Sequence, residues 1–417
     1  MPISRRQFLL SSSGLLCAPS ILSAKTGPKV VVIGGGWGGL AAARHLAPHA
    51  QVTLIERNSE FTSLPLSNRW LVGFDKGERL HQNYQKAAAE FGYRFVQAEV
   101  RGFDMNRREV STSTGHFKYD WLIVSAGISE TEDAFLNGDK KTITEIRKRF
   151  PSAYTAGNEL EILKQKLANF SGGEFLMNIP LAPYRCPPAP YERAAIIAHI
   201  IKSKKLKARL TVVEPNAPWA AYRRVFDEQF DGIINYLPNT QLRELDPSRQ
   251  IATMDIDELK FNDAIIMPPQ QAAELCLRNG LTGKNSAWAT VNPRNFAFLE
   301  DQHVFVIGDS VGPVSKIFGH YPKTGEIALR MGQIAATEII NQISGKVDEL
   351  ELPQGTCFAY LSLNPPEFTQ IDSRYRVRGD GEIIQKISQK RENNPRGEDD
   401  AWLNSWHQEL FGASTKV

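Results

Sequence analysis

The sequence predicts an α/β protein with two Rossmann-like domains, the first interrupted by the second, followed by a C-terminal α+β domain that forms an interface. Three observations lead to this fold class. First, a glycine-rich turn near residue 34 joins a short apolar run to a helical pattern. Second, a similar unit without the glycine turn begins near residue 173. Third, two further apolar runs that end in glycine flank the second unit. A length of 417 residues suits two or three packed domains.

The composition excludes several classes of protein. Hydrophobic residues make up 42% and charged residues 23%, which is typical of globular chains rather than disordered ones. With 49 Lys and Arg against 46 Asp and Glu, the net charge is +3, so the chain lacks the basic field of a nucleic-acid-binding protein. No apolar run reaches the roughly 18 to 20 residues that span a bilayer, so we expect no transmembrane segment.

Residues 1–24 resemble a cleavable signal peptide for twin-arginine export. Arg5 and Arg6 precede a moderately apolar stretch, and the segment closes on the small residue Ala24. The twin-arginine pathway characteristically carries proteins that are already folded around a cofactor. The segment therefore predicts a periplasmic protein. The alternative is a buried N-terminal helix.

The first element of the mature chain has the form of a dinucleotide site. Lys29–Ile33 predicts a buried parallel strand that leads directly into the glycine turn and a helix. The first glycine makes the tight turn, the second lets the backbone approach a pyrophosphate, and the last lets the helix lie close to the strand. A second predicted strand, Gln51–Ile55, ends at an acidic residue that can accept ribose hydroxyls. The expected contact residues are Gly34, Gly36, Gly38, Gly39, Glu56 and Arg57.

Two later segments favour FAD over NAD as the dinucleotide. The predicted strand in Tyr119–Ile128 closes on Ala126 and Gly127, and the one in His303–Val311 closes on Gly308 and Asp309. An aspartate after such a glycine typically holds a ribityl or pyrophosphate group. This three-part pattern resembles the flavoprotein disulfide reductases with two dinucleotide domains. It gives these expected limits: an FAD-binding domain at 27–142 and 282–345, an NAD-like domain at 143–281, and an interface domain at 346–417.

The NAD-like domain has lost its glycine turn. A strand near 174–179, a helix near 194–201 and a second strand, Arg209–Val213, ending at Glu214 keep the expected order. Prolines, however, stand between the first strand and the helix. Proline has no N–H to offer a phosphate, and its ring blocks close approach. We therefore expect this domain to bind no nicotinamide dinucleotide.

Three cysteines remain after removal of the signal, which contains Cys17. Cys276 lies in an ordinary helical pattern and is expected to be a small buried residue. Cys186 lies at the strand-to-helix turn of the NAD-like domain, and Cys357 follows the second FAD segment. Their spacing leaves three alternatives open: a redox pair, a structural disulfide or two free thiols.

The run from Tyr184 to Ala194 resembles the signature of the flavoprotein subunit of flavocytochrome c sulfide dehydrogenase. It matches the family's RCPPGPYERA except at Ala189. Further segments resemble other landmarks of the family in the same order, and together they span nearly the whole mature chain: Leu66–Asn68, Met267–Gln270, Tyr321–Thr324, Cys357–Phe358 and residues 401–411.

The resemblance implies a mechanism and its residues. Cys186 and Cys357 would form a disulfide against one face of the flavin, where sulfide attacks it. Glu192 would shuttle a proton, unless it forms a salt bridge with a neighbouring arginine. Lys323 would contact FAD and stabilise negative charge on the reduced flavin, unless it is a solvated lysine. Electrons would pass singly to a c-type cytochrome subunit. The haem would lie on that partner, because this chain has no Cys-x-x-Cys-His motif to attach one.

One departure from the family concerns how FAD is held. Family members often attach FAD through a cysteine, and Leu64 stands at that position here, so we expect noncovalent FAD. No metal site is expected. The rival functions are sulfide:quinone oxidoreductase, type II NADH dehydrogenase and a non-catalytic FAD-bearing electron carrier. The strongly charged segment 380–400 argues against membrane docking, and residues 388–400 are expected to form a polar loop.

Overall fold

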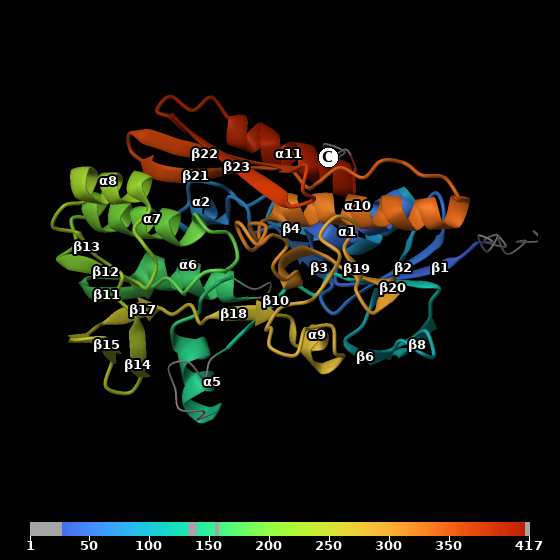
Figure 1. The fold of residues 1–417 in the computed structure, drawn as a ribbon. Helices are drawn as coiled ribbons and strands as arrows, with labels where there is room; N and C mark the ends of the chain where they lie inside the picture. Colours follow the sequence, from blue (N-terminus) through green and yellow to red (C-terminus); the bar gives the residue numbers. More distant parts are fainter. Residues whose placement is uncertain (1–26, 132–139, 155–157, 413–417) are drawn as a thin grey trace, which may run out of the picture.

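The computed structural model describes residues 27–131, 140–154 and 158–412, and Figure 1 shows their arrangement. The expected signal peptide at 1–24 lies outside the described residues. Three sheets dominate the molecule: one in the N-terminal domain, one in the central domain and one in the C-terminal domain. The predicted α/β class with two Rossmann-like sheets and a C-terminal α+β domain is confirmed.

The N-terminal domain is built on a six-stranded sheet in the order β19-β20-β9-β1-β2-β5. All neighbouring strands run parallel except β19, which pairs antiparallel with β20. The predicted strands are present, and their interior residues are almost fully buried because both faces are covered. The strands are β1 Lys29–Ile33, β2 Gln51–Glu56, β5 Arg94–Gln97, β9 Trp121–Val124, β19 Ala297–Phe298 and β20 Asp301–Val306.

Helices α1 (Trp37–Leu46) and α10 (Gly325–Ser344) of this domain pack closely against each other. A Cβ added at Gly332 would lie 2.2 Å from the carbonyl oxygen of Gly38, so only glycine permits this approach. The remaining elements of the domain are β3 Glu60–Thr62, α2 Ser67–Leu71, β4 His81–Asn83, α3 Tyr84–Phe91, β6 Val100–Asp104, β7 Glu109–Thr112, β8 Gly115–Lys118, α9 Glu274–Arg278 and the 3₁₀ turn η1 Gly308–Ser310.

The central domain contains a parallel sheet in the order β13-β12-β11-β17. Helices α7 and α8 lie between this sheet and the C-terminal sheet (Figure 1). A small antiparallel sheet, β14-β15-β16, completes the domain. The elements are α5 Lys140–Arg149, α6 Glu159–Asn169, β11 Gly173–Asn178, α7 Ala189–Ser203, β12 Ala208–Glu214, α8 Ala220–Gln229, β13 Ile234–Pro238, β14 Leu242–Asp246, β15 Ile251–Met254, β16 Glu258–Lys260 and β17 Asp263–Ile265.

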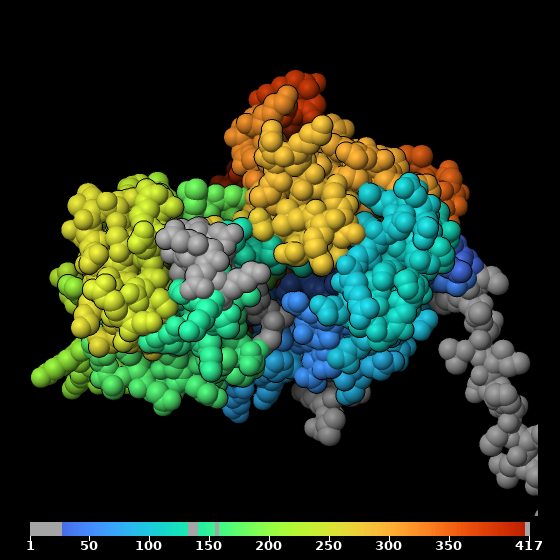
Figure 2. All heavy atoms as spheres, turned by 90° about the horizontal axis from the view of Figure 1, so that it is seen from below, coloured from blue at the N-terminus to red at the C-terminus, as the bar shows by residue number. Residues whose placement is uncertain are grey.

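The chain crosses between the two domains at an antiparallel strand pair, β10 (Ile128–Glu130) with β18 (Gln270–Ala272). Both crossings come earlier than the expected limits after residues 142 and 281. Figure 2, seen from below, shows the two domains as separate lobes, with gold residues that follow β18 lying between them. Residues after β18 thus reach the N-terminal domain and line its cavity.

The C-terminal domain is an antiparallel sheet of β21 (Gly355–Leu363), β22 (Pro366–Val377) and β23 (Ile383–Glu392), followed by α11 (Glu398–Phe411). The expected polar loop at 388–400 is wrong. β23 runs to Glu392, and α11 begins at Glu398. The charged residues of β23 are exposed on an edge strand, where charge discourages further strand pairing.

Candidate functional site

The glycine turn has the geometry predicted from its sequence. Gly34 has φ +93°, and a Cβ there would lie 2.3 Å from the carbonyl oxygen of Ser125. A Cβ at Gly39 would lie 1.9 Å from the carbonyl oxygen of Gly34, so the helix depends on glycine to lie against the strand end. Gly36 faces open space, with no atom within 4 Å of an added Cβ. The turn therefore leaves room for a ligand beside the N-terminus of α1.

A cavity of about 560 Å³ extends from this turn to the two cysteines. Its volume lies within the range typical of cofactor sites. All expected FAD contacts line it except Gly39, which instead supports the turn. Those lining residues are Gly34, Gly36, Gly38, Glu56, Arg57, Ala126, Gly127, Gly308, Asp309 and Lys323. The elongated site, with an open glycine turn at one end and a redox-active residue type at the other, fits FAD.

Glu56 and Asp309 are both tied to protein groups as well as facing the cavity. Glu56 accepts hydrogen bonds from the backbone N–H of Gly35 at 2.9 Å and from Asn58. Asp309 accepts from Nε of Arg185 at 2.7 Å, a pairing the sequence did not indicate. Since a carboxylate accepts several hydrogen bonds, both retain capacity toward a ligand.

The fold brings Cys186 and Cys357 together, although 171 positions separate them in the sequence. Cys186 lies just before α7, Cys357 lies in β21, and α7 packs on β21. Both residues line the cavity, and their side chains hydrogen-bond to each other. They are free thiols in the structure rather than the expected disulfide. The structure thus brings two thiols from distant parts of the sequence to one wall of the cavity.

The thiol of Cys357 is held in its protonated form. The hydrogen bond with Cys186 is the largest cause, followed by burial and the charges of Cys186, Glu192 and Glu326, and together they raise its pKa well above the ordinary value. Cys276 behaves as predicted. It is fully buried, it donates to Oγ of Ser310 at 3.6 Å, and burial raises its pKa to about 11.

The backbone of Cys186 is fixed across the domain boundary. Its φ is +52°, a left-handed conformation that is uncommon for a residue with a side chain. Its N–H donates to the carbonyl oxygen of Lys323 at 2.8 Å, and Arg185 forms a parallel β-bridge with Lys323. The thiol of Cys186 is thereby positioned by main-chain contacts from both domains.

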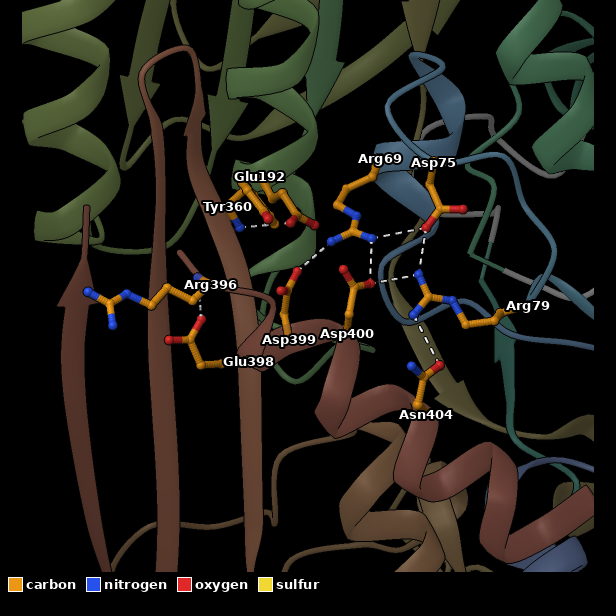
Figure 3. Close-up of polar contacts among 10 residues, drawn as sticks. All are labelled: Arg69, Asp75, Arg79, Glu192, Tyr360, Arg396, Glu398, Asp399, Asp400 and Asn404. Carbon is orange, nitrogen blue, oxygen red and sulfur yellow. Dashed lines mark hydrogen bonds and ion pairs between the residues drawn. The ribbon is translucent and has the colours of Figure 1, made fainter. Parts of the chain in front are cut away.

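Glu192 is buried next to the cysteine pair. Its carboxylate accepts hydrogen bonds from the N–H of Tyr360 at 2.8 Å and from Nδ2 of Asn68 at 2.6 Å (Figure 3 shows the contact with Tyr360). The salt-bridge alternative is wrong for the described residues, because Arg193 donates to Oδ1 of Asn68 and Arg185 to Asp309. Burial raises the pKa of Glu192, although these hydrogen bonds and nearby arginine charges lower it in part. A carboxyl with a raised pKa suits proton transfer.

Lys323 is buried rather than solvated, so the solvated alternative is wrong. Its Nζ donates to the carbonyl oxygens of Asp309 at 2.8 Å and Val311 at 3.0 Å, and it lies 3.7 Å from the ring centre of Trp288. Burial lowers its pKa to about 7, while Asp309 raises it and Arg185 lowers it further. The cavity wall therefore carries an amine that gains a proton easily when negative charge develops nearby.

In the central domain, the acidic residue that ends the second strand is buried in hydrogen bonds. Glu214, at the end of β12, is fully buried and accepts hydrogen bonds from the hydroxyls of Tyr191 and Tyr236. Burial raises its pKa. The loop before α7 offers prolines instead of glycines, as predicted. These residues support the prediction that nicotinamide dinucleotides do not bind here.

Sequence reasoning missed the ion-pair cluster that attaches α11 to the cavity wall, shown in Figure 3. Buried Arg69 pairs with Asp399 at 2.5 Å, Asp400 at 2.7 Å and Asp75 at 3.0 Å. Burial lowers the pKa of Arg69, but its carboxylate partners raise the pKa overall. No sequence signal links these residues, because Arg69 and Asp399 are far apart in the chain. Trp402 and Trp406 of α11 line the cavity.

Comparison with known proteins agrees with this geometry. Residues 28–160 match the family model "Pyridine nucleotide-disulphide oxidoreductase". Residues 160–268 match "Sulfide dehydrogenase [flavocytochrome c] flavoprotein chain, central". A sulfide-quinone reductase of Aquifex aeolicus (strain VF5) is 25% identical over 346 residues, which cover 77% of this chain and 78% of the relative.

Solved structures show the same fold. The sulfide:quinone oxidoreductase of Aquifex aeolicus superimposes with a TM-score of 0.74 at 21% identity, covering 92% of each chain. An NAD-dependent persulfide reductase from A. fulgidus gives a TM-score of 0.63 at 15% identity, over 85% of this chain and 65% of that one. The chain has the α/β fold of the flavoprotein disulfide oxidoreductases. Within the described ranges, no helix is long and apolar enough to cross a membrane, and no group of three or more His, Cys, Asp or Glu forms a candidate metal site.

Proposed function

We propose that this protein is an FAD-dependent oxidoreductase that oxidises sulfide, or a related reduced sulfur compound, through Cys186 and Cys357. The observation that carries the proposal is the meeting of two sequence-distant thiols in the wall of the dinucleotide cavity. The match of residues 160–268 to the sulfide dehydrogenase flavoprotein and the similarity to a sulfide-quinone reductase support the substrate class.

The residues suggest how each step proceeds. In the oxidised pair, hydrosulfide attacks one sulfur of the Cys186–Cys357 disulfide. One S–S bond forms, the other breaks, and the products are a cysteine persulfide and a cysteine thiolate. The sulfide sulfur loses two electrons, and the cysteine pair gains them. Glu192 accepts the proton of the attacking species. FAD, when bound, supplies a two-electron acceptor that can release electrons one at a time, and Lys323 offers a cation beside it.

Anaerobic titration with sulfide tests this chemistry. We expect sulfide to bleach the flavin absorbance of the parent protein, and we expect C186S and C357S to abolish the bleaching. C276S is the matched control, because Cys276 is a buried thiol that does not line the cavity. Bleaching of C186S at the parental rate would refute the role of the pair, and it would favour a simple FAD-bearing carrier.

We propose a c-type cytochrome as the electron acceptor, noncovalent FAD and a periplasmic location. The match to the flavocytochrome chain supports the cytochrome, Leu64 at the cavity wall supports noncovalent FAD, and the N-terminal arginine pair supports export. The similarity to the A. aeolicus enzyme favours a quinone as the second candidate acceptor. Mixing sulfide-reduced protein with cytochrome c or with a soluble quinone distinguishes the two, and acid denaturation that releases all flavin tests its attachment. Fractionation of cells expressing the parent or an Arg5→Lys, Arg6→Lys variant tests the location.

A further inference from the structure

We propose that Tyr154 is the substrate-binding donor of this site: its hydroxyl holds the hydrosulfide anion in the cavity beside Cys186 and Glu192. This inference rests on the proposed function and deepens it by assigning the group that recognises the substrate. Tyr154 enters the cavity from the segment that precedes α6, in the central domain.

The hydroxyl of Tyr154 is buried and has no hydrogen-bond partner among the described residues. The side chain is 3% exposed and lines the cavity. Burying a hydroxyl without a partner costs free energy, so such a group in a cavity wall indicates a ligand that satisfies it. The same cavity wall contains the thiols that react with the substrate.

The surroundings of Tyr154 favour an anion. The guanidinium carbon of Arg193 lies 4.7 Å from the centre of its ring, and Nη1 of Arg185 donates to its backbone carbonyl at 2.6 Å. Both arginines belong to the segment that contains Cys186. They fix the ring and add positive potential, and a phenol donor prefers an anion over a neutral molecule.

The hydroxyl stays protonated and can therefore donate. Burial raises the pKa of Tyr154 well above its ordinary value; the charge of Arg193 lowers it, and the charges of Cys186, Tyr184 and Glu192 raise it further. Glu192 has the opposite hydrogen-bonding role, because an ionised carboxylate accepts hydrogen bonds and donates none. Tyr154 thus offers the donor, and Glu192 the proton acceptor, to one HS⁻ ion.

A second buried tyrosine shows what the proposal excludes. The hydroxyl of Tyr222 also lacks a partner in the described part of the chain, but Tyr222 does not line the cavity. Its ring stacks on Tyr191 at 5.1 Å in the central core. We therefore assign substrate contact to Tyr154 alone.

The test compares Y154F with Y93F in the FAD-loaded protein. Tyr93 is a matched control, because its hydroxyl is also buried without a described partner but does not line the cavity. We expect Y154F to raise the KM for sulfide about tenfold, as for the loss of one hydrogen bond to an ion. We expect kcat to change little and the melting temperature to stay equal or rise, because an unpaired hydroxyl has been removed. Y93F should leave KM unchanged.

Reduction by dithiothreitol, a neutral dithiol, provides the second measurement. Y154F should be reduced by dithiothreitol as fast as the parent, which shows that the cysteine pair and flavin are intact. Any of three results would overturn the assignment of Tyr154. The first is a KM of Y154F within twofold of the parent, and the second is an equal rise of KM in Y93F. The third is a lower melting temperature of Y154F together with equally slowed reduction by sulfide and by dithiothreitol. If the parent itself is not reduced by sulfide, the proposed function fails rather than the assignment.

Discussion

The N-terminal and central domains contain the same strand–turn–helix unit, and they use it differently. In the N-terminal domain, glycines leave open space at Gly36 beside the start of α1. In the central domain, the turn before α7 carries prolines and places Cys186 in a left-handed conformation. The residues of the turn therefore determine whether such a unit leaves room for a ligand at the helix N-terminus or directs a thiol toward the neighbouring cavity.

The acidic residue at the end of the second strand differs in the same way. Glu56 lines the cavity and keeps the conformation of the glycine turn through the N–H of Gly35. Glu214, its counterpart, is sealed in the core by two tyrosine hydroxyls. The acidic side chain therefore faces a cavity in one domain and is buried in hydrogen bonds in the other.

The largest effect should come from breaking the N-terminal unit. Gly39→Ala places a Cβ 1.9 Å from the carbonyl oxygen of Gly34, so α1 must shift away from the turn. We expect the purified variant to lose its FAD, as measured by the ratio of flavin to protein absorbance. Gly379→Ala, where an added Cβ meets no atom within 4 Å, is the control. Parental FAD content in G39A would contradict the role of the turn.

The next effect concerns the attachment of α11 over the site. Arg69→Met removes the cationic partner of the buried Asp399 carboxylate, and breaking such a pair costs about 3–5 kcal/mol of unfolding free energy. Urea denaturation measures this change. Arg378→Ala removes an exposed ion pair with Asp380 and should have no measurable effect. Equal midpoints for the two variants would show that the cluster in Figure 3 does not secure the helix.

Glu192→Gln tests the proposed proton acceptor beside the cysteine turn. Loss of the proton acceptor should slow flavin reduction by sulfide by about 10²-fold. Burial raises the pKa of Glu192 above the ordinary 4.5. Between pH 4.5 and the raised pKa, the folded parent therefore binds more protons than the unfolded chain. The stability of the parent should therefore fall as pH rises from 4.5 through the raised pKa, and E192Q should lack this loss. Melting curves across pH check the sign, and a fall of the same size in E192Q would refute it.

The smallest effect is expected from restoring glycine to the central turn. The Pro187→Gly, Pro188→Gly variant should still fail to bind NADH, because Glu214 remains held by Tyr191 and Tyr236. NADH fluorescence titration measures binding, with the parent as the reference. Micromolar binding by the variant would show that the prolines alone exclude the nucleotide.

Local sequence patterns predicted the parts of the fold that depend on local physics. Apolar runs located β1, β2, β9 and β20, and the glycine spacing predicted the close contacts around Gly34 and Gly39. The closeness of Cys186 and Cys357 came from a family resemblance, since no local rule relates a turn to a distant strand. The loop expected at 388–400 was wrong because polar and charged residues on an exposed edge strand look like a solvated loop.

The polar pairs of the site could not be predicted for a related reason. Arg185 with Asp309, Arg69 with Asp399, and the unpaired hydroxyl of Tyr154 all depend on how separate elements pack together. Each residue type is ordinary at its own position in the sequence. Only tertiary structure shows that the charges are buried and that the Tyr154 hydroxyl has no partner among the described residues.

Because Cys186 is held by a main-chain hydrogen bond to Lys323, its position does not depend on the lysine side chain. The peptide group of residue 323 anchors the sulfur in place, while the ammonium group of the same residue sets the local electrostatics. Exchanging lysine for another residue would thus alter the field and leave the anchor untouched. The charge beside the cavity can therefore be changed by substitution at residue 323 while the backbone of Cys186 stays in place.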